Sequence, residues 1–428
     1  MNNCGYTTVE IPFGSRRDSI SIATSRLIDV LSPNPKETHL DQRKAIERVL
    51  SNPIGCGPIE SFVKSTDSIV IISEDISRFA RTDIIIEEIV KRLAHVGVPD
   101  DQILIVMALG SHRKMTEKEI EHKLGSTIYK RYKSTNSEFR DPSLLTYMGT
   151  APGGVEVLLD KRVANADIKI GVGSIVPHPA LGYTGGAKIV YPGTVGEDTV
   201  AQLHLRAAII DENIMGVVEN QARLEMEQWV DTIGLDFIVN SIVTPDNKTY
   251  EIVAGHYVEA HRAGVKFAEE IYKIGTRTAV DNVIVSSHTA DFDLWQATKA
   301  VIGGERIVKD GGRIILYTPC PEGVGPHPEF PYYCKGDKIK EDLANAIKGN
   351  FPSSQILPLS VGALIARVQK RIKVEIISPG ITAEEAATAG FNYAGSTLAD
   401  LQRLIDNQDQ SSTVSVLTHG GESFSILL

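Results

Sequence analysis

Short runs of β-branched and aliphatic residues alternate with helical patterns through most of the chain, and this alternation limits the fold more than any other feature. The runs are continuously apolar, which is expected of strands that are covered on both faces. Such strands, each followed by a helix, are typical of βαβ units on a parallel sheet. Strands are predicted at residues 68–73, 102–107, 168–172, 237–243, 282–287, 313–317 and 374–377.

Helices are predicted between these strands. An apolar stripe at helical spacing spans residues 82–95 and stops before Gly97. A second helix is expected to begin at Thr116, because Thr116 and Glu119 have the spacing of a capping box. A third helix is predicted over residues 258–274.

The length of 428 residues is enough for two or three domains of roughly 150 residues each. After the helix that ends at residue 274, a new strand begins a second α/β region. We therefore predict two α/β domains with mostly parallel sheets, over residues 1–275 and 276–428. The active site is expected in the interdomain cleft, a common place for ligand pockets.

Composition narrows the classes of function. The chain has 44 Lys and Arg residues against 54 Asp and Glu residues, a net charge of -10, which argues against a nucleic-acid partner. No apolar run approaches the roughly 20 residues that cross a bilayer, and the N-terminus lacks the order of a signal peptide. Four scattered cysteines without a Cys-x-x-Cys pair do not form a disulfide framework. A cytoplasmic protein without a membrane partner is expected.

Glycine is concentrated in residues 171–193, directly after the predicted strand at 168–172. Backbone N–H groups in such loops form cradles for anions, so a phosphate or carboxylate site is predicted there. The loop is not a Walker A motif, because Ile189 follows Lys188. It is not a dinucleotide fingerprint either, because Val176 stands where the third small residue belongs. An ordinary glycine-rich turn is the alternative.

Three histidines have a context that suggests chemistry. His112 and His178 follow predicted strands, where open α/β sheets bind their ligands, and His204 lies in the predicted helix after the glycine-rich loop. Imidazole transfers protons near neutral pH and is the commonest metal ligand. A single histidine is more often an ordinary polar residue, but three in this arrangement favour a functional site.

Two further pairs of residues could bind an anion. Arg78 could grip a phosphate or carboxylate, with Asp75 fixing its direction. Gln296 and Lys299 are three residues apart and could hold a carboxylate from one helix face. A surface ion pair and a solvated helix face are the alternatives.

Together these residues resemble the nickel-dependent lactate racemase family of 2-hydroxyacid racemases and epimerases. The resemblance extends over nearly the whole chain, and its long motif in the glycine-rich loop is highly specific. The motifs, in chain order, are Asp75-x-x-Arg78, Gly110-x-His112-Arg113-x-x-Thr116, His178-x-x-x-Gly182-Tyr183-Thr184-Gly185-Gly186-x-Lys188-x-x-x-Pro192-Gly193, His204 and Gln296-x-x-Lys299.

The resemblance implies a nickel-pincer nucleotide, a pyridinium mononucleotide whose two sulfur arms hold the metal. It implies that Lys188 is joined to this cofactor through a thioamide and that His204 completes the square-planar nickel site. Cofactor maturation proteins are implied as partners, because copper would bind such donors at least as well. The other implied roles are acid and base for His112 and His178, cofactor contacts for Asp75, Arg78, Gly182, Gly185 and Gly186, and substrate contacts for Arg78, Trp295, Gln296 and Lys299.

The implied reaction inverts C2 of a small-molecule 2-hydroxy acid. Removing hydride, which gives a 2-keto acid, avoids a carbanion beside an ionised carboxylate. One histidine takes the hydroxyl proton, and the other serves the opposite face after the keto group turns. Residues 1–275 would then bind the cofactor and carry the catalytic groups, and residues 276–428 would add substrate contacts.

Two departures from the family pattern bear on the substrate. Phe79 stands where the family usually has proline, and the segment Leu359-Ser360-Val361 lies where many lactate racemases carry a tryptophan. Because an aromatic side chain buries roughly 150 to 250 Å², its loss is expected to enlarge the pocket. Ser360 is therefore predicted to line a pocket for a 2-hydroxy acid larger or more polar than lactate.

Two other classes of function stay open at this point. His112, His178 and His204 could be the three ligands of a zinc hydrolase, which would leave Lys188 without a task. A non-catalytic anion-binding module would use Arg78 and the glycine-rich loop but would not need paired histidines.

Overall fold

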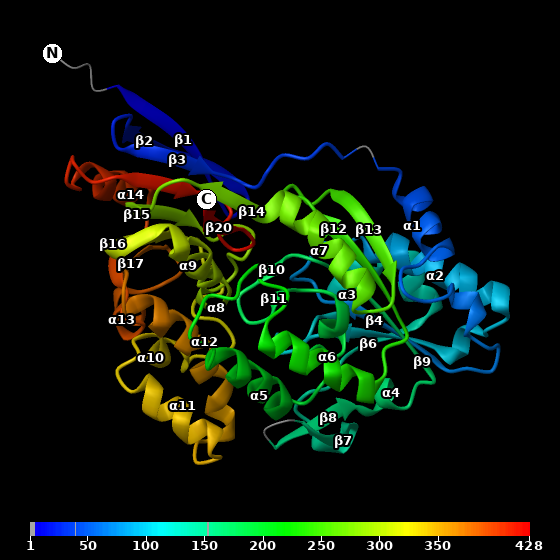
Figure 1. Ribbon diagram of the computed structural model, residues 1–428. Helices are drawn as coiled ribbons and strands as arrows, with labels where there is room; N and C mark the ends of the chain where they lie inside the picture. Colours follow the sequence, from blue (N-terminus) through cyan, green and yellow to red (C-terminus); the bar gives the residue numbers. More distant parts are fainter. Residues whose placement is uncertain (1–4, 39, 152–153) are drawn as a thin grey trace.

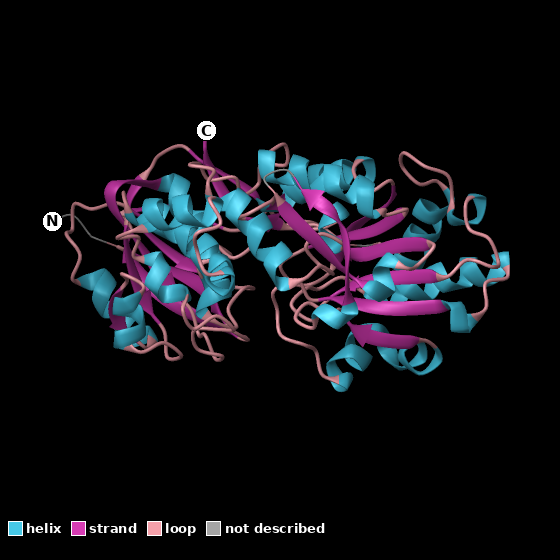
Figure 2. Ribbon diagram, turned by 90° about the horizontal axis from the view of Figure 1, so that it is seen from below, coloured by secondary structure: helices cyan, strands magenta, loops and turns pink. Residues whose placement is uncertain are grey.

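The computed structural model describes residues 5–38, 40–151 and 154–428, which form two six-stranded sheets. Figure 2 shows the sheets as separate sets of strands toward the two ends of an elongated molecule, with helices on both faces. This arrangement confirms the predicted α/β class with mostly parallel sheets.

The first sheet has the strand order β13-β12-β9-β4-β5-β6, and its neighbours are parallel except β12 and β13. Alternate residues of its central strand face two different apolar clusters: Val70 and Ile72 face one, and Ile69 and Ile71 face the other. Burial on both faces explains why the strand is continuously apolar. The strands are β4 (Ile69–Glu74), β5 (Ile103–Ala108), β6 (Lys133–Asn136), β9 (Ile168–Ser174), β12 (Phe237–Val243) and β13 (Thr249–Gly255).

The second sheet has the order β18-β17-β16-β15-β19-β3, with parallel neighbours throughout. Its strands are β3 (Leu27–Leu31), β15 (Val280–Ser286), β16 (Val308–Tyr317), β17 (Lys373–Ile377), β18 (Asn392–Gly395) and β19 (Val414–Leu417). Four two-stranded pairs complete the set: β1 (Tyr6–Phe13) with β2 (Arg16–Ala23), β7 (Leu145–Ala151) with β8 (Val155–Asp160), β10 (Pro177–His178) with β11 (Gly182–Tyr183), and β14 (Lys273–Thr276) with β20 (Phe424–Leu427).

Two features of the N-terminal segment cross the boundary predicted at residue 275. Strand β3 pairs with β19 at the edge of the second sheet. The β1–β2 hairpin packs Ile11 and Ile20 into an apolar cluster with Ile284 and Ile315 of that sheet. Figure 1 shows these blue strands beside the red C-terminal segment. The division into residues 1–275 and 276–428 stays a prediction.

Helices connect the strands. They are α1 (Gln42–Ser51), α2 (Thr82–Val96), α3 (Glu117–Arg131), α4 (Lys161–Ala164), α5 (Glu197–Ala208), α6 (Gln221–Ile233), α7 (Glu259–Tyr272), α8 (Leu294–Ala297), α9 (Lys299–Gly304), α10 (Phe330–Cys334), α11 (Ile339–Ile347), α12 (Ser353–Gln369), α13 (Ala383–Thr388) and α14 (Leu398–Asp406). Within the described part of the chain, no helix is long and apolar enough to cross a membrane.

The predicted helix signals are largely confirmed. Gly97 ends α2 in the left-handed conformation, with a φ of 91°. Thr116 and Glu119 form the predicted capping box at the start of α3. The prediction of a helix to residue 274 was wrong, because Lys273 and Ile274 belong to β14, which pairs in parallel with β20. A partner about 150 residues away along the chain leaves no local trace in the sequence.

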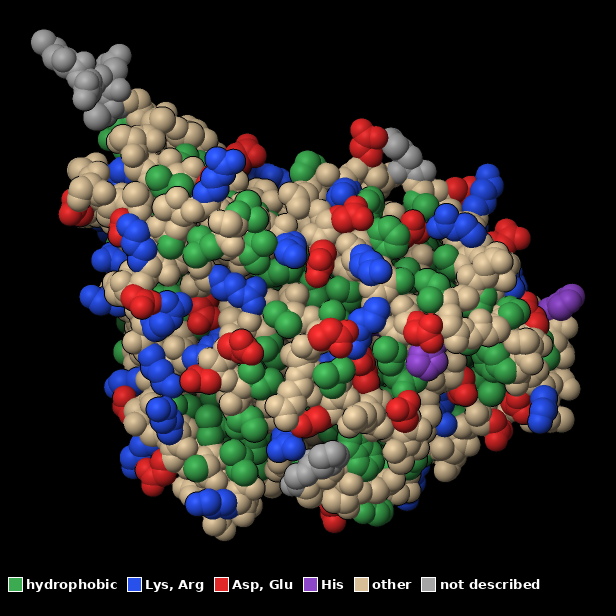
Figure 3. Space-filling model, viewed as in Figure 1, with side chains coloured by type: hydrophobic (Ala, Val, Ile, Leu, Met, Phe, Trp, Pro, Cys, Tyr) green, Lys and Arg blue, Asp and Glu red, His purple; other side chains and the backbone are tan. Residues whose placement is uncertain are grey.

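The surface carries both signs of charge. Figure 3 shows Lys and Arg side chains intermixed with Asp and Glu over one face of the molecule. Among the described side chains visible on that face, neither sign dominates a large area.

Candidate active site

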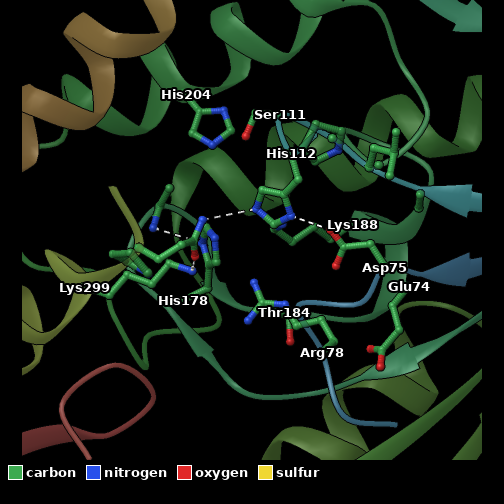
Figure 4. Close-up of a pocket in the computed structure, with 18 of the residues that line it drawn as sticks. Glu74, Asp75, Arg78, Ser111, His112, His178, Thr184, Lys188, His204 and Lys299 are labelled. Atoms are coloured by element: carbon green, nitrogen blue, oxygen red, sulfur yellow. Dashed lines mark hydrogen bonds and ion pairs between the residues drawn. The ribbon is translucent and has the colours of Figure 1, made fainter. Parts of the chain in front are cut away.

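A cavity of about 1000 Å³, a volume that includes space open to solvent, lies between the two sheets. Residues that follow β4, β5 and β9 line one side, and residues of α8, α9 and α12 line the other. Figure 4 shows how the polar side chains converge there. The predicted site residues that line the cavity are Asp75, Arg78, His112, His178, Gly185, Lys188, His204, Trp295, Gln296 and Lys299.

The strand order explains why these residues meet. In the first sheet the chain proceeds outward from β4 in both directions, through β5 on one side and β9 on the other. Open α/β sheets bind ligands at the carboxyl ends of strands where the order reverses in this way. Arg78 follows β4, His112 follows β5, and His178 follows β9.

His112 is oriented by a buried carboxylate. Its Nδ1 lies 2.5 Å from Oδ2 of Asp75, and the hydroxyl of Ser77 donates to Oδ1 of Asp75 at 2.6 Å. Burial opposes ionisation of Asp75, but the charge of His112 and the hydrogen bonds from His112 and Ser77 hold the pKa of Asp75 well below its usual value. Asp75 thus directs His112, a role that its spacing from Arg78 did not indicate.

His178 lies in a different environment. It is buried, and its Nδ1 accepts a hydrogen bond of 3.2 Å from the backbone N–H of Ala180. Burial lowers the pKa of His178 well below its usual value, and the positive charges of Lys188, Lys299 and Arg78 lower it further. The His178 ring is therefore neutral at physiological pH.

Three cationic side chains face the cavity without a carboxylate partner. Among the described residues, none of Arg78, Lys188 and Lys299 forms an ion pair, although Nζ of Lys299 donates to Oε1 of Gln296. Burial lowers the pKa of Lys188 to about 7, helped by Arg78 and Arg223, and it lowers that of Lys299 well below its usual value. The cavity therefore favours an anion, and Lys188 is in part an uncharged amine at neutral pH.

His204 presents one free nitrogen to the cavity. Its Nδ1 donates to the carbonyl of Val200, one turn earlier in α5, at 2.8 Å. Burial lowers the pKa of His204 to about 4, although this hydrogen bond opposes the effect. A neutral imidazole held by a carbonyl at Nδ1 is the usual second-sphere arrangement of a metal-binding histidine.

Only one of the three predicted cofactor-binding glycines lines the cavity. All three have positive φ, which favours glycine. Gly185 faces the cavity, whereas the N–H of Gly186 donates to Oδ1 of Asn240 at 2.8 Å. Gly182 lies against the carbonyl of Val217, which a Cβ would approach to 2.0 Å. Gly182 and Gly186 thus shape the loop and leave fewer free N–H groups than the anion-cradle interpretation assumed.

Residues of the helices α8 and α12 line the cavity with one aromatic and two aliphatic side chains. Trp295 packs against His327 and Phe330, with ring centroids 4.6 and 5.0 Å apart. Ser360 is buried in α12, and its hydroxyl donates to the carbonyl of Ile356 at 2.6 Å. The described α12 residues that line the cavity are Val361 and Leu364.

Several supporting residues were not predicted from the sequence. The fully buried Arg223 of α6 donates from Nε to the carbonyl of Leu181 at 2.9 Å and also to that of Tyr183. His261 of α7 contacts the carbonyl of Thr184 at 2.8 Å. These contacts from α6 and α7 fix the backbone of the glycine-rich loop.

The turn after β4 is supported in the same way. Nζ of the buried Lys123 lies 2.9 Å from Oε1 of Glu74 and 2.7 Å from the carbonyl of Arg78. The two residues of this ion pair are 49 positions apart in the chain. A local sequence pattern therefore carries no sign of the contact.

Comparison with known proteins identifies relatives of the whole chain. Residues 13–216 match the family model of the lactate racemase N-terminal domain. A lactate racemase from Lactiplantibacillus plantarum is 27% identical over 421 residues, which are 96% of this chain and 98% of that protein. A lactate racemase from Thermoanaerobacterium thermosaccharolyticum is 26% identical over 380 residues, 86% of this chain and 88% of that protein.

A solved structure has the same fold. The lactate racemase apoprotein from Thermoanaerobacterium thermosaccharolyticum superposes with a TM-score of 0.87 at 24% identity, over 98% of this chain and 100% of that one. The relatives named above indicate an isomerase. Over most of its length the chain is similar to lactate racemases, as its motifs predicted.

The zinc alternative is not favoured. Within residues 5–38, 40–151 and 154–428, no three His, Cys, Asp or Glu side chains are arranged to hold a metal ion.

Proposed function

We propose that the protein inverts C2 of a 2-hydroxy acid, with His112 and His178 as the groups that exchange the hydroxyl proton. The observation that carries the proposal is that both imidazoles and three cations without ion-pair partners face one cavity. An acid whose carboxylate binds Lys299 presents its hydroxyl to the imidazoles. Histidine pairs of this kind suit reversible proton transfer near neutral pH.

The carboxylate of the substrate is assigned to Lys299 and Gln296. Both side chains line the cavity and contact each other, although a break at Thr298 places them in the separate helices α8 and α9. Asp293 caps α8, because its carboxylate accepts from the N–H of Gln296 at 2.7 Å. This cap fixes the start of the helix and with it the direction of Gln296.

The residues present fit a nickel-pincer nucleotide. The buried amine of Lys188 is nucleophilic in its neutral form and suits covalent attachment, and His204 keeps Nε2 free for a metal. Arg78 would bind the phosphate of the nucleotide, since it has no carboxylate partner among the described residues. When bound, such a cofactor supplies a reversible acceptor for hydride, so that C2 can be inverted through a 2-keto acid.

The substrate is proposed to be larger or more polar than lactate. Helix α12 presents the aliphatic Val361 and Leu364 to the cavity, at and near the position where many lactate racemases carry tryptophan. Ser360 does not line the cavity, because its hydroxyl donates to the carbonyl of Ile356 in its own helix. We therefore propose that Val361, and not Ser360, accounts for the larger pocket. A sugar acid or a second carboxylate could occupy this space.

Chiral chromatography of 2-hydroxy acids incubated with matured protein tests the proposal. The protein is produced together with the cofactor maturation proteins, and each pure stereoisomer is offered separately. Conversion at C2, fastest for an acid larger than lactate, is expected. Hydrolysis of a test ester offered in place of the acids, without inversion of any acid, would favour the zinc alternative, and binding without turnover would favour an anion-binding module. Turnover of lactate far above that of every larger acid would contradict the substrate assignment.

Intact mass measures the attachment separately. Matured protein is expected to carry a mass increment that peptide mapping places at Lys188. The variant Lys188→Arg should lack the increment, because a guanidinium stays protonated and is not nucleophilic. An unchanged increment in this variant would exclude Lys188 as the attachment point.

A further inference from the structure

We propose that the two imidazoles of the site are held as opposite tautomers, with Nε2 bare on His112 and protonated on His178. This inference rests on the proposed function for its consequence, but the tautomers themselves follow from hydrogen bonds within the protein. Before a substrate binds, the site therefore offers different hydrogen-bonding groups to the two configurations at C2.

On His112 the neighbours determine which nitrogen carries the proton. A carboxylate can only accept, so the Nδ1 that lies 2.5 Å from Oδ2 of Asp75 carries a hydrogen. Nε2 of His112 lies 3.3 Å from Nε2 of Gln296. The orientation of the Gln296 amide is fixed from its other end, because its oxygen accepts from Nζ of Lys299. The NH₂ group therefore donates to a bare Nε2 on His112.

On His178 the arrangement is reversed. Its Nδ1 lies 3.2 Å from the backbone nitrogen of Ala180, which can only donate. Nδ1 is thus unprotonated, and the hydrogen of the neutral ring is on Nε2. The surrounding charges oppose the doubly protonated form, because Lys188, Lys299 and Arg78 all face this buried ring.

The two rings also differ in their access to solvent. The His112 side chain is 26% exposed and borders a second, more open pocket lined by Arg113, Phe292 and Glu322. His178 is buried. His112 can therefore exchange its proton with bulk water, whereas His178 depends on groups inside the cavity.

The consequence concerns recognition of the two configurations at C2. In this resting state a hydroxyl directed at His112 meets an acceptor and can donate, whereas a hydroxyl directed at His178 meets an N–H group. His178 can take up the hydroxyl proton only after its ring has changed to the Nδ1–H tautomer, which costs the hydrogen bond from Ala180. The two configurations are therefore expected to bind with different KM. Because enantiomers have equal free energies, kcat/KM is the same in both directions of a racemisation, and the configuration with the lower KM must also have the lower kcat.

Nitrogen-15 NMR of the apoprotein tests the tautomers directly. Histidine is labelled with nitrogen-15, and spectra correlating ring nitrogens with ring hydrogens distinguish protonated from bare nitrogens. The variants His112→Gln and His178→Gln assign the two rings. Two other rings provide references: the half-buried His204 donates from Nδ1 to Val200, and the buried His261 contacts Thr184 through Nε2.

In mildly alkaline buffer the His112 ring is expected to be protonated at Nδ1, as His204 is. The His178 ring is expected to be protonated at Nε2, as His261 is. The same tautomer on both catalytic rings, or a protonated Nδ1 on His178, would overturn the inference. Asp75→Ala should shift His112 toward the Nε2–H form and leave His178 unchanged; an unchanged His112 would show that Asp75 does not set its tautomer. His122→Gln removes an exposed histidine of α3 and should alter neither ring.

This experiment needs neither cofactor nor substrate, so it separates the inference from the proposed function. Opposite tautomers in a protein without racemase activity would contradict the proposed function alone. Racemisation by a protein whose two rings share one tautomer would contradict the inference alone. Fold loss in a variant is recognised from the His261 signal, which reports on the loop at Thr184.

Discussion

At the scale of single residues, the amine of Lys188 has the most unusual setting in the cavity. It is half-buried in the cavity wall near Arg78, Arg223 and Lys299 and has no carboxylate partner among the described residues. Evolution of a stable fold alone would not place an amine there, since burying it opposes its charged form. A chemical task explains its presence.

The apoprotein is expected to become more stable as pH is raised above about 7. The unfolded chain keeps the Lys188 proton up to about pH 10.4, whereas the folded protein releases it near pH 7, so the unfolded state binds more protons in this window. The free energy of unfolding should rise with pH in both proteins or in the wild type alone, and the slope of the wild type should exceed that of Lys188→Met by about 1 kcal/mol per pH unit. Urea unfolding at several pH values measures the slopes.

Lys130→Met is the matched control for this titration. Lys130 is exposed on α3, so its removal should leave the slope unchanged. Equal slopes for the wild type and Lys188→Met would show that the buried amine keeps its usual proton affinity.

Replacing either of the histidines that are proposed to exchange the hydroxyl proton should abolish most of the activity. His112→Ala and His178→Ala remove groups whose proton transfer contributes roughly 10² to 10⁴ to the rate. Racemisation by the matured variants is followed by circular dichroism of the substrate. His122→Ala, which removes an exposed histidine, should keep full activity. Retained activity in both cavity variants would favour an anion-binding module.

At the scale of elements, α6 holds the glycine-rich loop through one side chain. Arg223 donates to two loop carbonyls and pairs with Glu227, which also pairs with Arg262. The loop presents His178 and Lys188 to the cavity. The geometry of the site therefore depends on a buried ion pair outside it.

Arg223→Met is expected to lower the free energy of unfolding by about 3 kcal/mol. Removing one partner of a buried pair typically costs about 3 to 5 kcal/mol, and the lower end applies because Glu227 keeps Arg262. Denaturant unfolding measures the change. Arg206→Met, which removes a half-buried pair of Arg206 with Glu225 in neighbouring helices, should cost about 1 kcal/mol or less. Equal losses for the two variants would argue against a special role for Arg223.

At the scale of the whole molecule, the N-terminal segment belongs structurally with the C-terminal region. The β1–β2 hairpin covers the second sheet through Ile11 and Ile20, and β3 pairs with its edge. The chain then crosses to the first sheet, returns through β14 and ends in β20 beside it. The cavity is assembled where these two regions meet.

A fragment of residues 276–428 is expected not to fold alone. Without β1 to β3 it exposes Ile284 and Ile315 and an unpaired sheet edge, both of which favour aggregation. Fusing residues 5–33 to this fragment should restore a cooperative thermal transition, measured by circular dichroism. A cooperative transition in the fragment without the N-terminal residues would support a domain boundary at 275 as first predicted.

The local features of this protein followed from its sequence alone. Strands buried on both faces are continuously apolar, the capping box at Thr116 acts within three residues, and the ends of β4, β5 and β9 position Arg78, His112 and His178 by rules general to α/β sheets. The family motifs indicated the same residues.

Tertiary structure decided everything that depends on distant partners. The pairing of Asp75 with His112, the grip of Arg223 on the glycine-rich loop and the position of β3 join segments from 37 to nearly 400 residues apart. The direction of Ser360 was also decided by packing, because a helical residue faces whatever its helix covers. Such contacts depend on how elements pack, and packing is a property of the whole chain that no short pattern encodes.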